Sequence, residues 1–104
     1  AASDVYKRQI NLPVKGLNAS GTFYISFLNL PRHRIYAPQQ VQLLKDGVAY
    51  KTIDLKPDNS PEKGEMMKAT VPADLNGTEQ LSIKISCLKK PGTQMGIDEI
   101  AFIP

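Results

Sequence analysis

The chain has 104 residues, of which 41% are apolar and 22% charged, the balance of one small globular domain with a single core. A net charge of +3, with acids and bases interspersed, excludes the basic stripe that a dedicated nucleic-acid-binding domain normally carries. The single cysteine, Cys87, excludes an internal disulfide and a cysteine-based zinc site, and no apolar run is long enough to span a bilayer. We therefore expect a monomeric domain that neither binds nucleic acid nor inserts into a membrane.

The first nine residues, AASDVYKRQ, resemble a read-end artefact that recurs in translated metagenomic assemblies. We therefore expect residues 1–9 to be a non-native or disordered leader, and residues 10–104 to form a single domain. On this interpretation the natural N-terminus is missing, so the absence of an export signal carries no information about location.

Apolar and polar residues alternate with a period of two through most of the chain, and no segment shows a sustained helical stripe. The first strand is predicted at residues 10–14, where Pro13 cannot donate to a sheet and therefore favours an edge position. The clearest strand is predicted at residues 21–29, which places two phenylalanines and an isoleucine on one face.

Residues 40–55 are typical of a β-hairpin with arms at roughly 40–45 and 48–55. Asp46 and Gly47 lie at its centre, and this pair favours the two-residue turn that needs positive φ at both positions. A polar loop with two prolines and a glycine follows. The remaining predicted elements are this loop at 56–64, strands at 65–71, 79–88 and 97–103, a turn at Asn76–Gly77 and a loop at 89–96.

About seven short strands separated by turn signals are typical of a β-sandwich. We therefore expect an all-β fold of two packed antiparallel sheets, each with one buried face and one face in water. The residues expected in the shared core are Phe23, Ile25, Phe27, Leu81, Ile83, Ile85, Ile100 and Phe102.

Two stretches resemble galactose-binding-like jelly rolls: VQLLKDGVAYKTIDL at residues 41–55 and MGIDEIAFIP at residues 95–104. The first is similar to the Asp-Gly hairpin of that superfamily, and the second to its closing strand. The order of the elements is also similar across residues 10–104. The superfamily includes carbohydrate-binding modules and discoidin domains. The resemblance implies a jelly-roll sandwich, and many members carry one or two further N-terminal strands that a fragment can lack.

Catalysis is not expected from the residue pattern. Glycoside hydrolysis usually needs two carboxylates that converge on the bond, whereas Asp98 and Glu99 are adjacent on a predicted strand and should point to opposite faces. His33 is the only histidine, and Cys87 shares the apolar face of its strand, so we expect a buried thiol rather than a nucleophile.

Asp98 has the same parity as Ile100 and Phe102 and should therefore face the core, where a charge needs a partner or a metal ion. In related jelly rolls an Asp at this place helps to hold a structural calcium ion, so the resemblance implies Asp98 as a calcium ligand. The alternative is that Asp98 caps backbone N–H groups where the strand begins, or faces solvent across a β-bulge.

The loop NLPRHRIYAP, residues 29–38, is the candidate ligand site. Arg32, His33 and Arg34 can donate hydrogen bonds to sugar hydroxyls, and Tyr36 offers a flat apolar face with a hydroxyl at its tip. The resemblance implies sugar binding by such a set of Arg, His and aromatic residues. The alternative is a solvated basic loop whose Tyr36 packs against the rim of the sandwich.

We therefore expect a non-catalytic carbohydrate-binding accessory module of a secreted or cell-surface bacterial polysaccharide-processing protein. Its partner would be a glycan or a neighbouring catalytic domain of the same chain. One alternative is a structural spacer that packs on a catalytic domain, and another is a discoidin-like module that binds protein or a membrane surface. If the glycan does not bind at residues 29–38, the next candidate is the surface around Gln94 and Met95.

Overall fold

The structure is a computed structural model that describes residues 5–14, 19–88 and 92–104. These residues form strands and one short 3-10 turn, with no α-helix among them, and no helix there is long and apolar enough to cross a membrane. The elements are β1 (Val5–Pro13), β2 (Ser20–Asn29), η2 (Pro31–His33), β3 (Ile35–Tyr36), β4 (Gln40–Lys45), β5 (Val48–Asp54), β6 (Glu65–Asp74), β7 (Gln80–Leu88), β8 (Gln94–Met95) and β9 (Ile97–Ile103).

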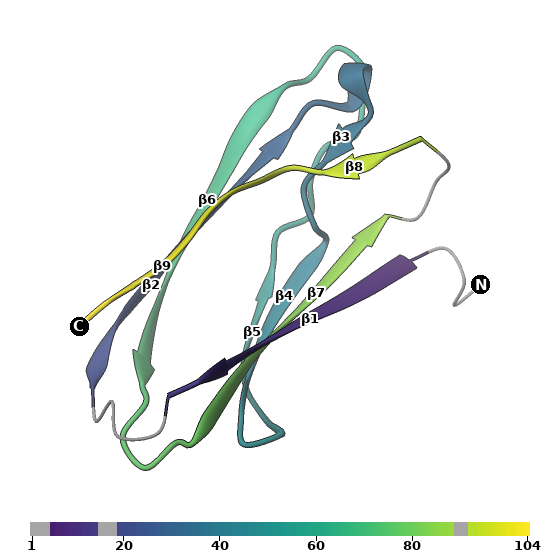
Figure 1. Ribbon diagram of the computed structural model, residues 1–104. Coiled ribbons are helices and arrows are strands. Elements are labelled where there is room, and N and C mark those ends of the chain that lie inside the picture. The colour runs from purple at the N-terminus through teal and green to yellow at the C-terminus, as the bar shows by residue number, and fades with distance from the viewer. Residues whose placement is uncertain (1–4, 15–18, 89–91) are drawn as a thin grey trace.

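Seven of the described strands form two layers, which Figure 1 shows packed face to face, and β3 and β8 form a separate two-stranded sheet. One sheet has the order β1-β7-β4-β5 and the other has the order β6-β2-β9, and every ladder in both is antiparallel. The chain passes repeatedly from one sheet to the other, as in a jelly roll. The prediction of an all-β antiparallel sandwich is confirmed.

The core lies between the two sheets and contains the side chains that the period-two pattern placed inward. Phe27 and Ile85 are completely buried, and the rings of Phe23 and Phe102 pack with their centroids 4.8 Å apart. Ile100 and Phe102 are only partly buried, in contrast to the prediction, because β9 is an edge strand that neighbouring strands cover from one side.

The predicted hairpin is present, and its turn lies at the predicted residues. Asp46 has a φ of 49° and Gly47 a φ of 82°, so both central residues adopt the positive φ that their identities favour. A bulge after Leu43 leaves Tyr50 of β5 without a cross-strand partner in β4. The hydroxyl of Tyr50 accepts a hydrogen bond from Asp74 N at 3.2 Å, which joins the hairpin to the end of β6.

Several strand boundaries differ from the prediction, and β6, for example, ends at Asp74 rather than at residue 71. β1 begins at Val5 rather than Ile10, so residues 5–9 of the predicted leader pair with β7, while residues 1–4 lie outside the described residues. β1 is an edge strand, as predicted, and it ends at Pro13. The predicted loop at 89–96 contains the short strand β8, and its residues 89–91 are not described.

Candidate functional site

The loop at residues 29–38, which we call the apical loop, is held by its own backbone. Leu30 N donates to Ile35 O at 2.8 Å and Ile35 N donates back to Leu30 O at 3.1 Å. Pro31 begins the 3-10 turn η2, and Arg34 ends it in the left-handed region with a φ of 59°. A closed turn of this kind fixes where the side chains of Arg32, His33 and Arg34 leave the backbone.

Asn29 anchors the apical loop from below, and the sequence analysis did not identify this role. Its side chain is completely buried; Oδ1 accepts a hydrogen bond from Ala37 N at 2.9 Å, and Nδ2 donates to Asp58 O at 2.8 Å. The amide therefore joins the end of β2 both to the far end of the apical loop and to the polar loop at 56–64. The only sequence signal for it is an amide at an inward position of an apolar strand.

The apical loop also pairs with the segment that precedes β9. β3 and β8 form a two-stranded parallel ladder in which Tyr36 lies beside Met95. Gln94 N donates to Arg34 O at 2.9 Å, and Gly96 N donates to Tyr36 O at 3.0 Å. The two candidate ligand regions of the sequence are therefore one surface at one end of the sandwich (Figure 1).

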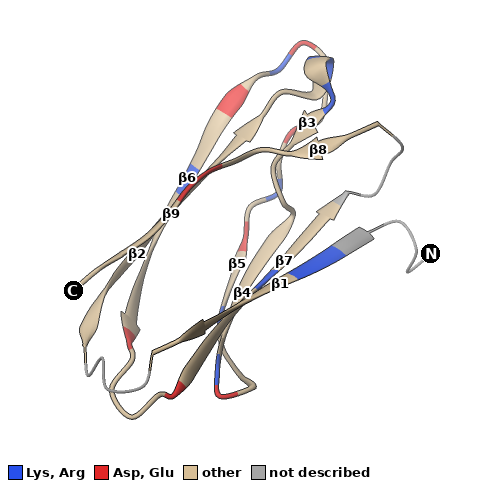
Figure 2. Cartoon of the chain, in the orientation of Figure 1, with Lys and Arg blue, Asp and Glu red and all other residues tan. Residues whose placement is uncertain are grey.

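The structure exposes the side chains of Arg32, His33 and Arg34, and it leaves Tyr36 half-buried. In Figure 2 the blue that marks Lys and Arg appears on η2 at this end of the molecule. Cys87 lies below Tyr36, with its sulfur 3.8 Å from the Tyr36 carbonyl oxygen, and is buried as predicted. The apical loop thus exposes the side chains of two arginines and one histidine, whereas the aromatic face of Tyr36 is only partly available.

A second candidate region is a shallow groove of about 240 Å³ on the outer face of the β6-β2-β9 sheet, which we call the sheet groove. Tyr24 and Ser26 lie on β2, which is the central strand of this sheet. Tyr24 lies opposite Thr70 of β6, and Ser26 lies opposite Lys68 of β6. The polar lining of the sheet groove is Tyr24, Ser26, Lys68, Thr70, Asp98 and Glu99.

The expectation that Asp98 and Glu99 point to opposite faces is wrong, because Asp98 accepts a hydrogen bond from the Ser26 hydroxyl and Glu99 is the cross-strand partner of the same Ser26. Ser26 pairs with Glu99, whereas Phe27 pairs with Ile97, so Asp98 is an extra residue in β9. This bulge breaks the alternation of faces on which the parity argument depends. Figure 2 shows an acidic part of β9 and a basic part of β6, the two strands that flank β2.

Asp98 is exposed and does not face the core, so the prediction from the alternation of faces is wrong. The alternative holds, in which the Asp98 side chain faces solvent across a β-bulge. Ser26 Oγ donates to Asp98 Oδ2 at 2.6 Å and satisfies one of its oxygens. Among the described residues, no cluster of three or more His, Cys, Asp and Glu side chains could hold a metal ion. Within the described part of the chain, Glu99 is the one other carboxylate that lines the sheet groove with Asp98.

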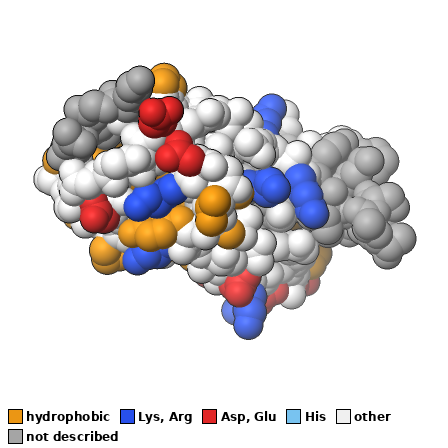
Figure 3. Space-filling view, turned by 90° about the horizontal axis from the view of Figure 1, so that it is seen from below, with side chains coloured by type: hydrophobic (Ala, Val, Ile, Leu, Met, Phe, Trp, Pro, Cys, Tyr) orange, Lys and Arg blue, Asp and Glu red, His pale blue; other side chains and the backbone are white. Residues whose placement is uncertain are grey.

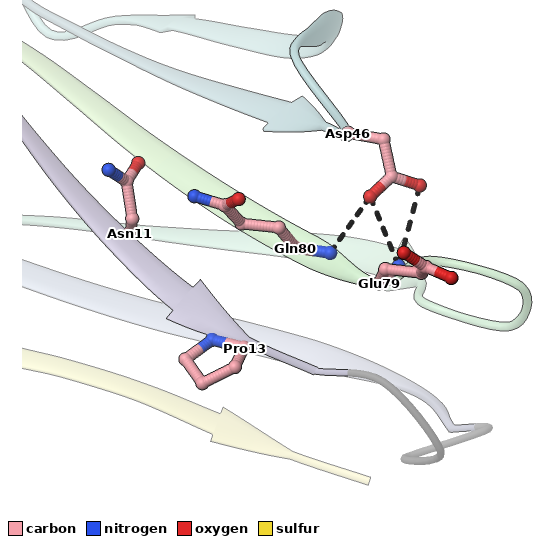
Figure 4. A pocket seen from close by; sticks show the side chains of 5 residues that line it. All are labelled: Asn11, Pro13, Asp46, Glu79 and Gln80. Atoms are coloured by element: carbon pink, nitrogen blue, oxygen red, sulfur yellow. Dashed lines mark hydrogen bonds between the residues drawn. The ribbon is translucent and has the colours of Figure 1, made fainter.

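A hollow of about 460 Å³ lies at the opposite end of the sandwich and is lined by Asn11, Pro13, Asp46, Glu79 and Gln80 (Figure 4). The Asp46 carboxylate accepts hydrogen bonds from Gln80 N at 2.8 Å and Glu79 N at 3.1 Å. These bonds join the hairpin turn to the start of β7, so the Asp46 carboxylate stabilises this contact between the two segments.

The face seen from below in Figure 3 mixes acidic, basic and apolar side chains.

Two exposed aspartates have a lowered pKa because neighbouring groups donate hydrogen bonds to them. The backbone N–H of Asn76, followed by its side-chain amide and the hydroxyl of Ser20, lowers the pKa of Asp74. The backbone N–H of Ser60, followed by its hydroxyl, lowers the pKa of Asp58. Both carboxylates brace turns, at opposite ends of β6.

Comparisons of the chain with protein-family models, with curated proteins and with solved structures find no match in any of the three. The resemblance to galactose-binding-like jelly rolls therefore stays a prediction. The class of protein that the fold defines is an all-β antiparallel sandwich.

Proposed function

We propose that the protein is a non-catalytic module that binds a glycan through the apical loop. The observation that carries this proposal is the row of exposed side chains of Arg32, His33 and Arg34, two of them guanidinium groups, on a turn whose backbone is fixed. A fixed turn lowers the entropy that must be lost when a ligand orders the donors. The sites of such modules are typically loops that a rigid β-scaffold holds in place.

The charge of this row favours a glycan that carries carboxylate or sulfate groups. Guanidinium groups bind such anions through paired, charge-assisted hydrogen bonds, and they also donate to neutral hydroxyls. Tyr36 contributes a half-buried aromatic side chain. Affinity should be weak for one small site, so the module would act through avidity within a larger secreted or surface bacterial protein.

The alternative of a spacer that packs on a catalytic domain needs a continuous apolar patch. On the outer face of the β6-β2-β9 sheet, exposed Met66 lies opposite Leu28 at one end and exposed Ile103 lies opposite Thr22 at the other. The polar lining of the sheet groove lies between them. This separation favours ligand binding over packing against a neighbour.

The test is an array of acidic and neutral glycans, followed by titration of the best ligand by calorimetry. The double variant Arg32→Ala/Arg34→Ala should lower affinity by at least about tenfold while leaving the melting temperature nearly unchanged. Lys84→Ala removes a cation from β7, away from the apical loop, and is the matched control. An array without any acidic hit, or a hit that survives the double substitution, would overturn the proposal.

A further inference from the structure

We infer that the sheet groove is a second ligand site, separate from the apical loop, and that it takes the uncharged sugar units of a neutral glycan. It is a defined hollow on the outer face of the β6-β2-β9 sheet. It combines an aromatic side chain, a carboxylate pair, an ammonium group and two hydroxyls. These are the groups that together recognise the apolar face and the hydroxyl rim of a pyranose ring.

Tyr24 supplies the flat surface. It is 42% exposed, although it lies on β2, the central strand of its sheet, where side chains from both neighbouring strands could have covered it. Its cross-strand partners are Thr70 and Ala101, both of which are small. A ring between two small neighbours has room for a second flat body to lie on it, and the C–H face of a sugar has the matching shape.

The β9 bulge supplies the acceptors. Because Asp98 is an extra residue, it joins Glu99 in lining the sheet groove. Ser26 is only 7% exposed and donates to Asp98 Oδ2 at 2.6 Å, which orients the carboxylate. Two carboxylates beside one aromatic ring provide charge-assisted acceptors for neighbouring hydroxyls.

The charge of the sheet groove decides which glycan it accepts. Asp98 and Glu99 carry two negative charges and Lys68 one positive charge, so the lining has a net charge of −1. An anionic sugar would be repelled there, whereas a neutral sugar can donate to the carboxylates and accept from the ammonium group. The apical loop has the opposite sign, so the two sites should prefer different glycans.

The experiment uses neutral hexaoses of β-linked glucose, xylose and mannose, with an oligogalacturonate as the anionic probe. Titration calorimetry measures affinity, and amide chemical shifts locate the ligand on the wild-type chain. At least one neutral hexaose should bind and shift amides of β2, β6 and β9. Tyr24→Ala should lower its affinity by at least about tenfold, whereas Tyr24→Phe, which keeps the ring, should change it by less than about threefold.

The double variant Asp98→Asn/Glu99→Gln should also lower affinity for the neutral hexaose by at least about tenfold, because amides replace the charged acceptors. Glu62→Gln, in the polar loop, is the matched control and should have no effect. Arg32→Ala/Arg34→Ala should not affect neutral binding either, so failure here is separate from failure at the apical loop. Three outcomes would overturn the inference: no neutral hexaose binds, binding survives Tyr24→Ala, or a calcium chelator abolishes it.

Discussion

Asn29 and Ala37 are joined across the base of the apical loop by a buried hydrogen bond of 2.9 Å from the Ala37 N–H to the Asn29 side chain. The bond lies outside the paired Leu30–Ile35 hydrogen bonds, so the Asn29 amide adds a second, buried closure at the base of the loop. Asn29→Ala leaves the Ala37 N–H buried without its acceptor. We expect it to lower the free energy of unfolding by about 1–3 kcal/mol, measured by chemical denaturation.

The control for this substitution is Asn59→Ala, which changes an exposed asparagine in the neighbouring polar loop. It should change the free energy of unfolding by about 0.5 kcal/mol or less. Equal effects of the two substitutions would show that Asn29 does not anchor the loop.

Gly96 allows the segment between β8 and β9 to pass close to β2. A Cβ atom at this position would overlap the carbonyl oxygen of Leu28 and lie 2.8 Å from Ile35 Cγ2. Gly96→Ala should therefore force the backbones apart and destabilise the protein by about 1–3 kcal/mol, seen as a lower melting temperature. Gly64→Ala is the comparison, because its Cβ would meet only the flexible end of Leu30 at 3.0 Å. A tolerated Gly96→Ala would contradict the close approach.

Phe27 and Ile83 lie on facing sheets at the centre of the core, with exposed fractions of 0% and 1%. Truncating either to Ala removes buried apolar surface and leaves a cavity, so each should cost about 2–5 kcal/mol in denaturant titrations. Val48→Ala, at a side chain that is 69% exposed, should be nearly neutral. Melting temperatures unchanged by both core truncations would refute the assignment of strand faces.

The Asp74 carboxylate should make the free energy of unfolding depend on pH in the acid range. Its pKa is lowered by the backbone N–H and the side chain of Asn76, so the folded protein binds a proton less readily than the unfolded chain does. The stabilisation is therefore present above the ordinary pKa of 3.8 and is lost as the pH falls through the lower folded value. Asp74→Asn should reduce the difference in melting temperature between pH 7 and pH 3.

The counterpart of this substitution is Asn76→Ala, which removes the side-chain donor but keeps the backbone N–H. It should reduce the same difference in melting temperature, and by less than Asp74→Asn does. If neither change alters the pH dependence, the turn at the end of β6 is not an acid-sensitive element.

The sequence predicted the elements whose geometry is set locally. The Asp46–Gly47 turn needs only the φ preferences of two residues, and the faces of β2 and β7 follow from alternation alone. Asp98 was misplaced because its bulge exists only where β9 pairs with β2, which nothing in the local sequence records. The pairing of Tyr36 with Met95 depends on the whole sandwich in the same way, so two candidate loops could not be recognised as one surface.

Strand order along the chain has a consequence for how the protein reaches its folded state during synthesis. β4 and β5 are joined by a two-residue turn and can pair as soon as they leave the ribosome. β1 must wait for β7, and β2 must wait for both β6 and β9, so these early strands emerge long before their partners. Loop closure over such distances is slow, and during that delay the aromatic face of β2 is open to mispairing and aggregation. Shielding of this strand by a chaperone would raise the yield of folded protein more than shielding of the hairpin would.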